Sequence, residues 1–467
     1  MSNIITKLRE AIGPKKVITD ETELDKQRHD YWVVSHLRDY LAQQSEHALC
    51  IVRPRETADV QAILKLANET RTPVMPYGLG SGVCGGVLAN AKAILLDMSA
   101  MNRIVDIDET NLLATFEAGK NGLEAEEAVA AKGLTIGHWP QSIGVSSVGG
   151  WVATRASGQF STAYGNIENI IYAIEAVLPN GEVVNIGISP RAASGPDLRH
   201  IFLGSEGTMG VITKVTFSLR RQAQERAYSA FYTSTMAEGI EAQRQIIQLG
   251  YTPPVMRQYD NSEVRRNFAE TVRDEDGLLI MVHEGPTAMV AAEKAAIAEI
   301  AKKSGLDEAP EAAVTKWLSS RNHVPSWTSL FEQNVVAETI EVAAPWTKIM
   351  DVYDQVVASL NEVPGIVNAS GHSSHVYRSG INLYFTFAAY LEDKEALEAA
   401  YFDCADRVLK ATAANAGTIS HHHGIGRARR DYLVNDLGKG GVALLQTIKR
   451  AIDPNHIMNA GVLIPDD

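Results

Sequence analysis

The chain has 467 residues, of which 45% are hydrophobic and 21% charged, as in globular proteins with ample material for a core. Its formal net charge of −13 argues against nucleic-acid binding, which needs clustered lysine and arginine. Three widely spaced cysteines exclude a disulfide framework, no apolar run could span a membrane, and the first residues lack a signal-peptide pattern. We therefore expect a soluble, cytoplasmic protein with no nucleic-acid partner and no membrane span.

In chain order, the hydrophobic pattern predicts a helical lead-in over residues 1–45 and then alternating strands and helices. The predicted strands cover residues 48–52, 73–77, 93–98, 103–108, 112–118, 171–178 and 182–186. Predicted helices cover residues 57–68 and 123–132. Pro179-Asn180-Gly181 is a strong turn signal between the last two strands. The pattern to about residue 220 is typical of an α+β domain.

The pattern changes near Arg220, where longer helices begin to alternate with strands. Helices are predicted over residues 236–248, 288–302 and 348–361, and strands over residues 277–283 and 381–388. These elements indicate a second domain at residues 221–420. The remaining residues, 421–467, contain a run of three histidines, a predicted helix over residues 440–452 and a turn after it.

Five glycines lie within the nine residues from Gly78 to Gly86. Glycine lets backbone N–H groups approach an anion closely, although a flexible loop is the alternative explanation. The fragment GSGVCG in this cluster matches the dinucleotide fingerprint, but that fingerprint must open a helix, and residues 89–91 predict a turn into a strand. Two more glycine-bearing polar stretches follow at residues 137–158 and 204–212. Together the three stretches indicate one extended, phosphate-bearing ligand held by a single domain.

The run His421, His422 and His423 is compatible with a metal site, with proton transfer at neutral pH, or with a polar loop. In an extended segment the first and third side chains share one side and the second faces the other. Three adjacent histidines therefore make a poor metal cage by themselves, and the local sequence leaves the choice open.

These stretches resemble the FAD-binding vanillyl-alcohol oxidase and p-cresol methylhydroxylase (PCMH-type) superfamily, and most strongly its alkylglycerone-phosphate synthase branch with bacterial relatives. The resemblance covers roughly residues 45–467 and is most specific in GHWPQS, VGGWVATRASG, YGNIEN, SGPDLRHIFLGSEGTMGVIT, RQYDNSE and HHHGIG. It implies an α+β protein with a two-subdomain PCMH-type FAD-binding domain at residues 46–220. An α+β cap domain at residues 221–420 would hold the substrate, and residues 421–467 would return to pack on the FAD domain.

The resemblance also implies how the cofactor is held. Some members attach FAD covalently through a histidine in the first glycine loop, which this chain lacks, so we expect non-covalent FAD. Cys84 is better explained as a small buried residue than as a flavin tether. The residues expected to bind FAD are Pro76, Tyr77, Gly78, Leu79, Gly80, Ser81, Gly82, Gln141, Ser142, Ser146, Ser147, Thr154, Ser157, Glu206, Gly210 and Ile212.

The resemblance places acid–base chemistry in the second half of the chain. The catalytic residues that it implies are His422, His423, Tyr384, His138, Arg257 and His421. His422 and His423 are the leading acid–base candidates, while Tyr384 is alternatively a core aromatic residue of a strand. Arg257 would bind an anionic substrate through its planar guanidinium, or alternatively form a surface ion pair with Asp260 or Glu263.

Two departures from the pattern limit what can be transferred. A further arginine that binds the substrate phosphate in the synthase has no clean counterpart here, and Arg321 and His323 are the available substitutes. Position 141 is glutamine where the synthase has an acidic residue. Flavin binding is compatible with both departures, whereas they put the ether-lipid reaction in doubt.

The D-2-hydroxyacid dehydrogenases of the same superfamily hold a metal with two histidines and a glutamate. The corresponding positions here are His375, Asn382 and His422, so the second histidine and the carboxylate are both missing. We therefore expect no metal. A histidine-only zinc site built from His372, His375 and His422 is the alternative.

These expectations combine into one leading hypothesis. The chain would be an FAD-dependent oxidoreductase that oxidises a C–OH group of a small, anionic hydroxy acid or alcohol by hydride transfer to the flavin N5 atom. Arg257, with Arg321, would anchor the anion, an unidentified electron acceptor would reoxidise the FAD, and the protein would form a homodimer. The alternative is a transferase of the alkylglycerone-phosphate synthase type, which uses a flavin adduct without net oxidation.

Overall fold

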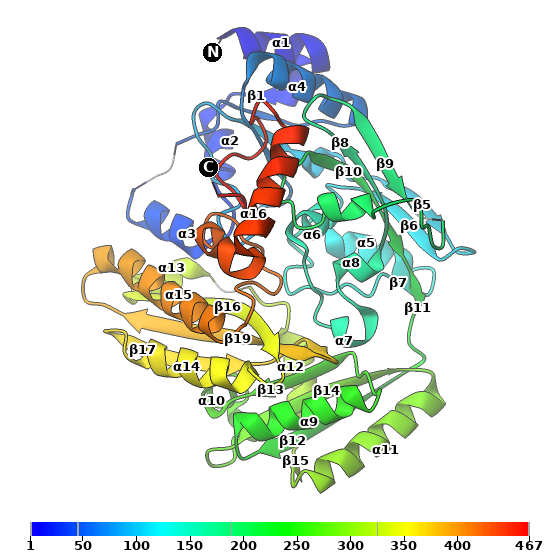
Figure 1. Cartoon of the computed structure of the whole chain (residues 1–467), viewed down its shortest axis with the longest axis vertical. Coiled ribbons are helices and arrows are strands. Elements are labelled where there is room, and N and C mark those ends of the chain that lie inside the picture. Colours follow the sequence, from blue (N-terminus) through cyan, green and yellow to red (C-terminus); the bar gives the residue numbers. More distant parts are fainter. Residues whose placement is uncertain (1, 44–45, 188, 325, 466–467) are drawn as a thin grey trace.

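The computed structural model describes residues 2–43, 46–187, 189–324 and 326–465, and it is an α+β protein built on three main sheets. Figure 1 shows the largest sheet below the other two, with the red C-terminal helix beside the upper part. Within the described residues, no helix combines the length and the apolar character that a membrane crossing requires.

The first sheet has four strands in the order β1-β2-β4-β3. Their bounds are β1 Val17–Ile18, β2 Cys50–Val52, β3 Val74–Tyr77 and β4 Ile94–Asp97. Helices α1 (Ser2–Ile12) and α4 (Thr57–Thr70) pack on it through a shared apolar core. The prediction of a purely helical lead-in is therefore wrong in one respect. Strand β1 lies inside it and pairs with β2, while α2 (Glu21–Lys26) and α3 (Val33–Tyr40) are the helices that follow.

The second sheet has five antiparallel strands in the order β5-β6-β10-β8-β9. These are β5 Ile104–Asp108, β6 Leu113–Glu117, β8 Ile171–Val177, β9 Val183–Gly187 and β10 Val211–Ser218. Both predicted hairpins are confirmed. Phe116, Trp151 and Phe217 form the centre of its core. The helices of this part are α5 Gly122–Ala130, α6 Val148–Thr154, α7 Ser161–Tyr164 and α8 Ile167–Ile170.

A small two-stranded ribbon, formed by β7 (Leu134–Thr135) and β11 (Arg220–Arg221), precedes the third sheet. The third sheet is antiparallel in the order β15-β12-β14-β13-β17-β19-β16, with β18 paired to β19. Its strands are β12 Glu225–Thr233, β13 Val255–Tyr259, β14 Gly277–Gly285, β15 Asp307–Glu308, β16 Val335–Pro345, β17 Ile366–His372, β18 Val376–Tyr377 and β19 Gly380–Tyr390.

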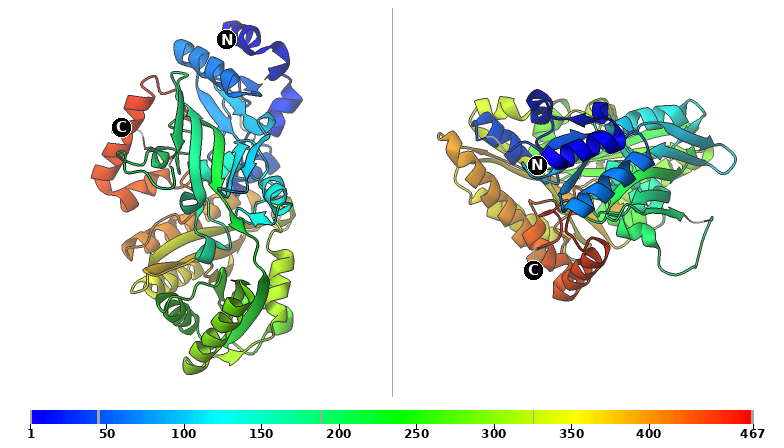
Figure 2. Two further views of the ribbon diagram at one scale, coloured as in Figure 1. Left: turned by 90° about the vertical axis from the view of Figure 1, so that its right-hand side faces the viewer. Right: turned by 90° about the horizontal axis from the view of Figure 1, so that it is seen from above.

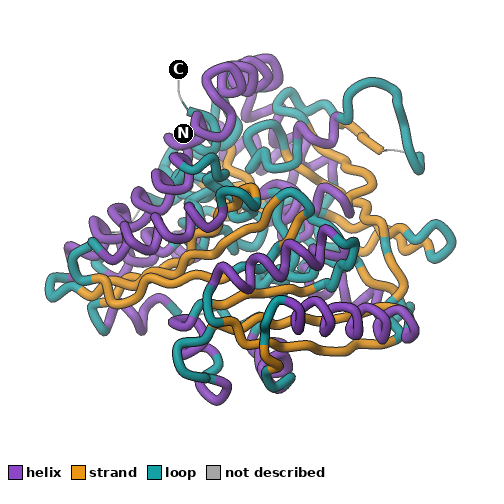
Figure 3. Tube along the Cα trace, turned by 60° about the horizontal axis from the view of Figure 1, so that its bottom comes forward, coloured by secondary structure: helices purple, strands orange, loops and turns teal. Residues whose placement is uncertain are grey.

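Long helices cover one face of this eight-stranded sheet, as Figure 3 shows. They are α9 Met236–Gln248, α11 Thr287–Lys303, α14 Ile349–Asn361 and α15 Leu397–Ala414. Three shorter helices complete this part, α10 Asn261–Asn267, α12 Ala312–Ser320 and α13 Trp327–Glu332. Leu383, Phe385 and Phe387 of β19 lie in the same apolar cluster as residues of α14 and α15. Because side chains alternate along a strand, Tyr384 faces the opposite side of the sheet.

The last segment crosses back to the first sheet. Helix α16 (Leu433–Ile452) begins earlier than predicted and contains a break at Gly438, where φ is 64° and ψ is 169°. Both views in Figure 2 place this helix on the outside of the molecule. After it, Met458 forms a parallel bridge with Val74 of β3.

Candidate active site

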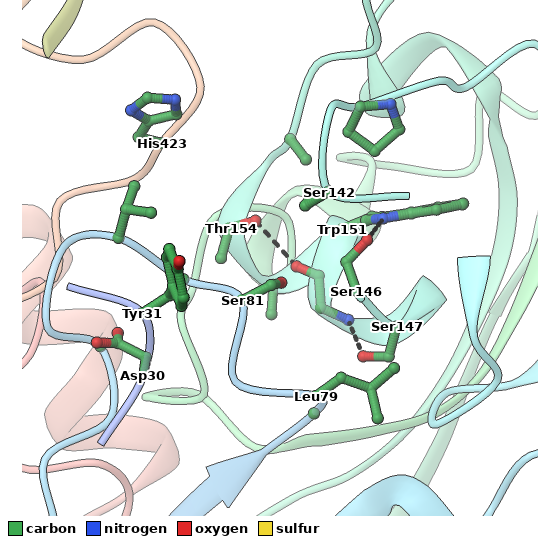
Figure 4. A pocket seen from close by; sticks show the side chains of 18 of the residues that line it. Asp30, Tyr31, Leu79, Ser81, Ser142, Ser146, Ser147, Trp151, Thr154 and His423 are labelled. Carbon is green, nitrogen blue, oxygen red and sulfur yellow. Dashed lines mark hydrogen bonds between the residues drawn. The ribbon is translucent and has the colours of Figure 1, made fainter. Parts of the chain in front are cut away.

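A cavity of about 540 Å³ lies between the glycine-rich stretches of the first two sheets and the uncovered face of the eight-stranded sheet. All sixteen residues expected to bind FAD line it. Four of the six expected catalytic residues also line it, namely Arg257, Tyr384, His422 and His423. Figure 4 shows His423 on one side of this cavity and the serines of the second glycine stretch on the other.

The first glycine loop forms a close-fitting wall of the cavity. A Cβ atom at Gly78 would lie 2.5 Å from Ser147 Oγ, so a side chain there would fill the space between the two loops. Gly80 has a φ of +72°, which L-amino acids with a side chain rarely adopt. The loop runs from β3 to β4 without opening a helix, which confirms that it is not a dinucleotide fingerprint of the Rossmann type. An exposed backbone of this kind suits the pyrophosphate of FAD.

The second glycine stretch presents hydroxyl groups that are fixed by the helix they belong to. Ser147 Oγ caps α6 by accepting from the backbone N–H of Gly150, and Ser146 Oγ accepts from Trp151 Nε1 at 2.8 Å. Thr154 Oγ1 donates to the carbonyl of Gly150 at 2.9 Å. Both serine hydroxyls keep a proton to donate, so this wall also fits an oxygen-rich ligand such as FAD.

Glu206, which the sequence assigns to the flavin site, joins two segments of the chain. Its Oε1 accepts from the backbone N–H of Ile425 and its Oε2 from that of Gly426, each at 2.7 Å. Burial raises the pKa of Glu206 to about 7. The residue therefore holds the segment that follows the three histidines against the third glycine stretch.

Asp30 and Tyr31 line the cavity but were not predicted. The backbone N–H of Tyr31 donates to the carbonyl of Gly82 at 2.7 Å, which fixes this segment on the glycine loop. Burial raises the pKa of Asp30 to about 7. No sequence motif surrounds either residue, so only the fold could have identified them.

Four side chains form a row across the eight-stranded sheet. Tyr259 of β13 pairs in register with His372 of β17, His372 with Tyr384 of β19, and Tyr384 with Glu341 of β16. The His372 and Tyr384 rings stack with centroids 4.9 Å apart and planes 6° apart. Residues directly opposite one another on one face are close neighbours, so the row fixes the position of Tyr384.

Tyr384 and His422 form the closest polar pair in the cavity. Tyr384 Oη lies 2.5 Å from His422 Nε2. Burial raises the pKa of Tyr384 above its usual range and lowers the pKa of His422 well below its own. The pair therefore consists of a neutral phenol and a neutral imidazole, which can exchange a proton across one hydrogen bond.

Glu341 holds the three-histidine segment in place. Its Oε1 accepts from the backbone N–H groups of His422 at 2.9 Å and His423 at 2.6 Å, and its Oε2 pairs with Arg429 Nη2 at 2.6 Å. Burial would raise the pKa of Glu341, but the charges of Arg429 and His423 hold it well below its usual range. The sequence could have indicated this residue, because Glu341 lies inside the apolar stretch VVAETIEVAAP and a buried carboxylate needs a charged or hydrogen-bonding partner.

Arg257 is a buried cation that faces the cavity, with 7% of its surface exposed. Its Nε donates to Tyr259 Oη at 2.6 Å, and its guanidinium lies 5.3 Å from the centre of the Trp317 ring. No carboxylate of the described residues forms an ion pair with it, so the alternative of a surface pair with Asp260 or Glu263 is wrong. The two terminal nitrogens remain available to a ligand.

Arg321, expected to bind substrate, does not line the cavity. Its Nη1 donates to Gln159 Oε1 at 2.7 Å, and its guanidinium lies above the rings of Trp139 and Phe160. Burial lowers its pKa to about 10. The arginine therefore positions Gln159, which does line the cavity.

Two of the expected catalytic histidines lie behind the wall of the cavity. His138 is fully buried against Trp151, with ring centroids 4.6 Å apart, and burial lowers its pKa to about 3. His421 contacts His422 and Tyr377 and does not reach the cavity surface. The alternation expected for an extended segment does not hold, because the segment is a bend in which His422 and His423 both reach the cavity.

The structure gathers His375, His421 and His422, with one nitrogen from each within 4.8 Å of the others. This set differs from the alternative zinc site considered from the sequence, because His421 replaces His372. The Nδ1 atoms of His421 and His422 lie 2.7 Å apart, which is the distance of a shared hydrogen bond. We assign no metal ligands here, and the absence of a metal remains a prediction.

Two family models match the chain. The model described as FAD binding domain matches residues 48–187, and the model described as FAD linked oxidases, C-terminal domain, matches residues 222–463.

Three relatives illustrate the range of similar proteins. The uncharacterized FAD-linked oxidoreductase YgcU of Escherichia coli K12 is 32% identical over 99% of this chain and 98% of its own. The alkyldihydroxyacetonephosphate synthase of Trypanosoma brucei brucei is 28% identical over 89% of this chain and 73% of its own. The D-lactate dehydrogenase of Archaeoglobus fulgidus is 27% identical over 91% of this chain and 93% of its own.

Solved structures share the fold. An alkyldihydroxyacetonephosphate synthase superposes with a TM-score of 0.83 at 23% identity, covering 98% of this chain and 85% of that protein. A p-cresol methylhydroxylase with substrate bound superposes with a TM-score of 0.80 at 16% identity, covering 100% and 98%. The implied PCMH-type fold is therefore confirmed.

Proposed function

Because the chain belongs to the family of FAD-linked oxidases, we propose that it oxidises a C–OH group of a small, anionic hydroxy acid or alcohol. FAD, when bound along the glycine stretches, supplies the acceptor for the hydride that such an oxidation releases. The substrate would occupy the end of the cavity beside the eight-stranded sheet.

Arg257 is the observation that carries this proposal. A buried guanidinium without a carboxylate partner is costly, and an anionic ligand in the cavity offsets that cost. Its Nε is fixed by Tyr259, so the terminal nitrogens approach a carboxylate or phosphate in a defined plane. The anion would thus be held on the same sheet face as Tyr384.

Tyr384 and His422 handle the hydroxyl proton in this proposal. Tyr384 Oη accepts the proton of the substrate while its own proton moves to His422 Nε2 across 2.5 Å. Both groups are neutral beforehand, because burial raises the pKa of the tyrosine and lowers that of the histidine. His423, on the same wall, bounds the substrate space.

The FAD is proposed to be non-covalent. Cys84 does not line the main cavity; its Sγ contacts the carbonyl of Gly424 at 3.5 Å, and burial raises the pKa of its thiol above the usual range. An external electron acceptor and a homodimeric state complete the proposal.

Alkyl transfer is the second candidate, and the similarity to the alkyldihydroxyacetonephosphate synthase of Trypanosoma brucei brucei favours it. The name of the D-lactate dehydrogenase relative favours oxidation of a hydroxy acid. The two candidates differ in whether the flavin ends reduced.

Anaerobic mixing of the purified flavoprotein with hydroxy acids and sugar-derived acids distinguishes them. Loss of the oxidised-flavin absorbance with one of these compounds supports oxidation. Exchange of an acyl for an alkyl chain on dihydroxyacetone phosphate, with the flavin oxidised throughout and no electron acceptor present, would overturn it.

A further inference from the structure

A continuous line of hydrogen bonds leads out of the cavity from the Tyr384–His422 pair through residues that the proposed reaction does not use. It begins at Tyr384, passes through His422, His421 and Tyr377, and ends at Asn166. Tyr384 and His422 line the cavity, whereas the other three residues lie outside it. Tyr377 and Asn166 are partly exposed, and exposed residues follow Tyr377 directly. The line therefore runs from the cavity to two partly exposed residues.

Each step has the length of a hydrogen bond. Tyr384 Oη lies 2.5 Å from His422 Nε2, and His422 Nδ1 lies 2.7 Å from His421 Nδ1. His421 Nε2 lies 2.6 Å from Tyr377 Oη, which in turn lies 3.2 Å from Asn166 Oδ1. A proton can pass along these contacts without movement of the heavy atoms.

The histidines restrict how the protons are arranged. A neutral imidazole has one donor and one acceptor nitrogen, and both nitrogens of His421 and of His422 belong to the line. Only two arrangements satisfy every contact from Tyr384 to Tyr377, one in which all groups donate away from the cavity and one in which all donate toward it. In the first, Tyr377 Oη donates to Asn166 Oδ1, and in the second it accepts from Asn166 Nδ2 at 3.1 Å. Passage of one proton converts the first arrangement into the second.

Burial keeps the groups of the line neutral. It lowers the pKa of His421 to about 4 and that of His422 well below its usual range. It also raises the pKa of Tyr377 and of Tyr384 above the usual range. A charge resting on any of these side chains is unfavourable, which favours transfer of the proton along the whole line.

The line is surrounded by carboxylates, arginines and further histidines. Glu341 of β16 and His423 act on both histidines of the line, Arg429 acts on His422, and Arg155 acts on His421. Arg257 acts on Tyr384 and on the neighbouring His375. Arg155 and Glu168 act on Tyr377 at the outer end, where they form a partly exposed ion pair at 3.4 Å.

We propose that this line conducts the hydroxyl proton of the substrate from the cavity to solvent, with His421 and Tyr377 as positioning residues that act through His422. The inference rests on the proposed oxidation of a C–OH group. The substrate O–H bond breaks and its proton binds Tyr384 Oη, whose own proton moves to His422 Nε2. The proton on His422 Nδ1 moves to His421 Nδ1, and that on His421 Nε2 moves to Tyr377 Oη.

Tyr377 then releases its proton to water beside Asn166, so one proton enters the line and one leaves. The two electrons and the hydrogen of the substrate C–H bond leave separately as a hydride, for which the FAD of this family is the acceptor. After the product leaves, one proton from solvent enters at Tyr377 and one leaves Tyr384 to water in the open cavity, and this reverse passage with rotation of the hydroxyl groups restores the first arrangement.

Nitrogen NMR of histidine-labelled holoenzyme tests the line without turnover. We expect His421 and His422 to be neutral between about pH 6 and 8. Tyr377→Phe should change the ring-nitrogen shifts of both His421 and His422, although it touches only His421. Tyr164→Phe is the matched control, because Tyr164 is also partly buried and donates one hydrogen bond, to Glu284, away from the cavity. Unchanged His422 shifts in Tyr377→Phe would overturn the line.

The rate of anaerobic flavin reduction tests whether the line carries the substrate proton during the reaction. Tyr377→Phe should slow reduction about 10- to 100-fold with unchanged FAD occupancy and substrate affinity. In the wild type the rate should depend on the deuterium fraction of the solvent along a curve, because several protons move together, and in Tyr377→Phe this dependence should become linear. Concentrated imidazole buffer should restore part of the rate of the variant. His421→Gln should act in the same direction, which covers the case that one variant folds poorly. A wild-type rate and isotope effect in both variants would overturn the proposal.

Failure of the proposed function gives a different result. If no substrate reduces the flavin of the wild-type protein, the oxidation is wrong, and the nitrogen shifts alone decide about the line. If Tyr377→Phe then changes the nitrogen shifts of both His421 and His422, the hydrogen-bonded line stands and only its assigned substrate is wrong. If the His422 shifts do not change, the line and the oxidation are both wrong.

Discussion

Glu341 Oε1 accepts a hydrogen bond from the backbone N–H of His423 at 2.6 Å, although Glu341 lies on the edge strand β16 of the eight-stranded sheet and His423 on the C-terminal segment. The carboxylate is fully buried and its other oxygen is paired with Arg429. The geometry of the three histidines therefore depends on one buried ion pair.

Removing that carboxylate charge should destabilise the protein strongly. In Glu341→Gln the buried guanidinium of Arg429 loses its partner, which costs about 3–5 kcal/mol of the free energy of unfolding. Urea unfolding of the apoprotein measures this loss. Glu398→Gln is the control, because its pair with Arg38 at 2.6 Å is partly exposed and contributes about 1 kcal/mol or less. Equal losses in the two variants would contradict the role of Glu341.

The contribution of Glu341 should depend on pH in one direction. Its pKa is held well below the usual range in the folded protein, so its stabilisation is fully present above the unfolded pKa of about 4.3. It is lost as the pH falls through the lower, folded pKa. The difference in unfolding free energy between wild type and Glu341→Gln should be constant from about pH 6 to 8 and shrink below about pH 4. A difference that grows in acid would contradict this sign.

Arg257 should determine affinity for the anionic group of the substrate. Arg257→Met is expected to raise KM about 10- to 100-fold, since a hydrogen bond to a charged group is worth about 1.5–3 kcal/mol. The control is Arg321→Met, which removes a partly buried guanidinium that contacts Gln159 but does not itself line the cavity. A larger effect on KM at Arg321 than at Arg257 would reverse the assignment.

Activity should not require a metal. The Nδ1 atoms of His421 and His422 share a hydrogen bond at 2.7 Å, and a zinc ion would need both lone pairs. Dialysis against a chelator should leave flavin reduction unchanged, and metal analysis should find less than one equivalent of zinc. Loss of activity that zinc restores would place a metal on His375, His421 and His422.

Much of the fold could be predicted because it follows from local patterns. The hairpin at residues 171–186 has a Pro-Asn-Gly turn between alternating strands, and α9 was predicted at its observed bounds. Strand β1 was missed because two residues carry no periodicity. Its strand character comes from pairing with β2, more than thirty residues later in the chain.

The site was predictable where a motif carried it and unpredictable where the fold assembled it. The resemblance carried by the glycine-bearing stretches gave all sixteen cavity residues assigned to FAD, and the histidine run gave His422 and His423. Asp30 has no motif, and the roles of Glu341 and Arg429 arise only when β16 meets the C-terminal segment. His138 was assigned to the site through the family resemblance, whereas its ring packs behind Trp151 and does not line the cavity.

The most direct test of the account is anaerobic flavin reduction in Tyr384→Phe. The variant keeps the ring that stacks on His372 but loses the hydroxyl 2.5 Å from His422. Reduction by the true substrate should slow by about 100-fold or more, with FAD occupancy and substrate affinity unchanged. Tyr390→Phe, at the exposed end of the same strand, should reduce at the wild-type rate. A wild-type rate of flavin reduction in Tyr384→Phe would contradict the account.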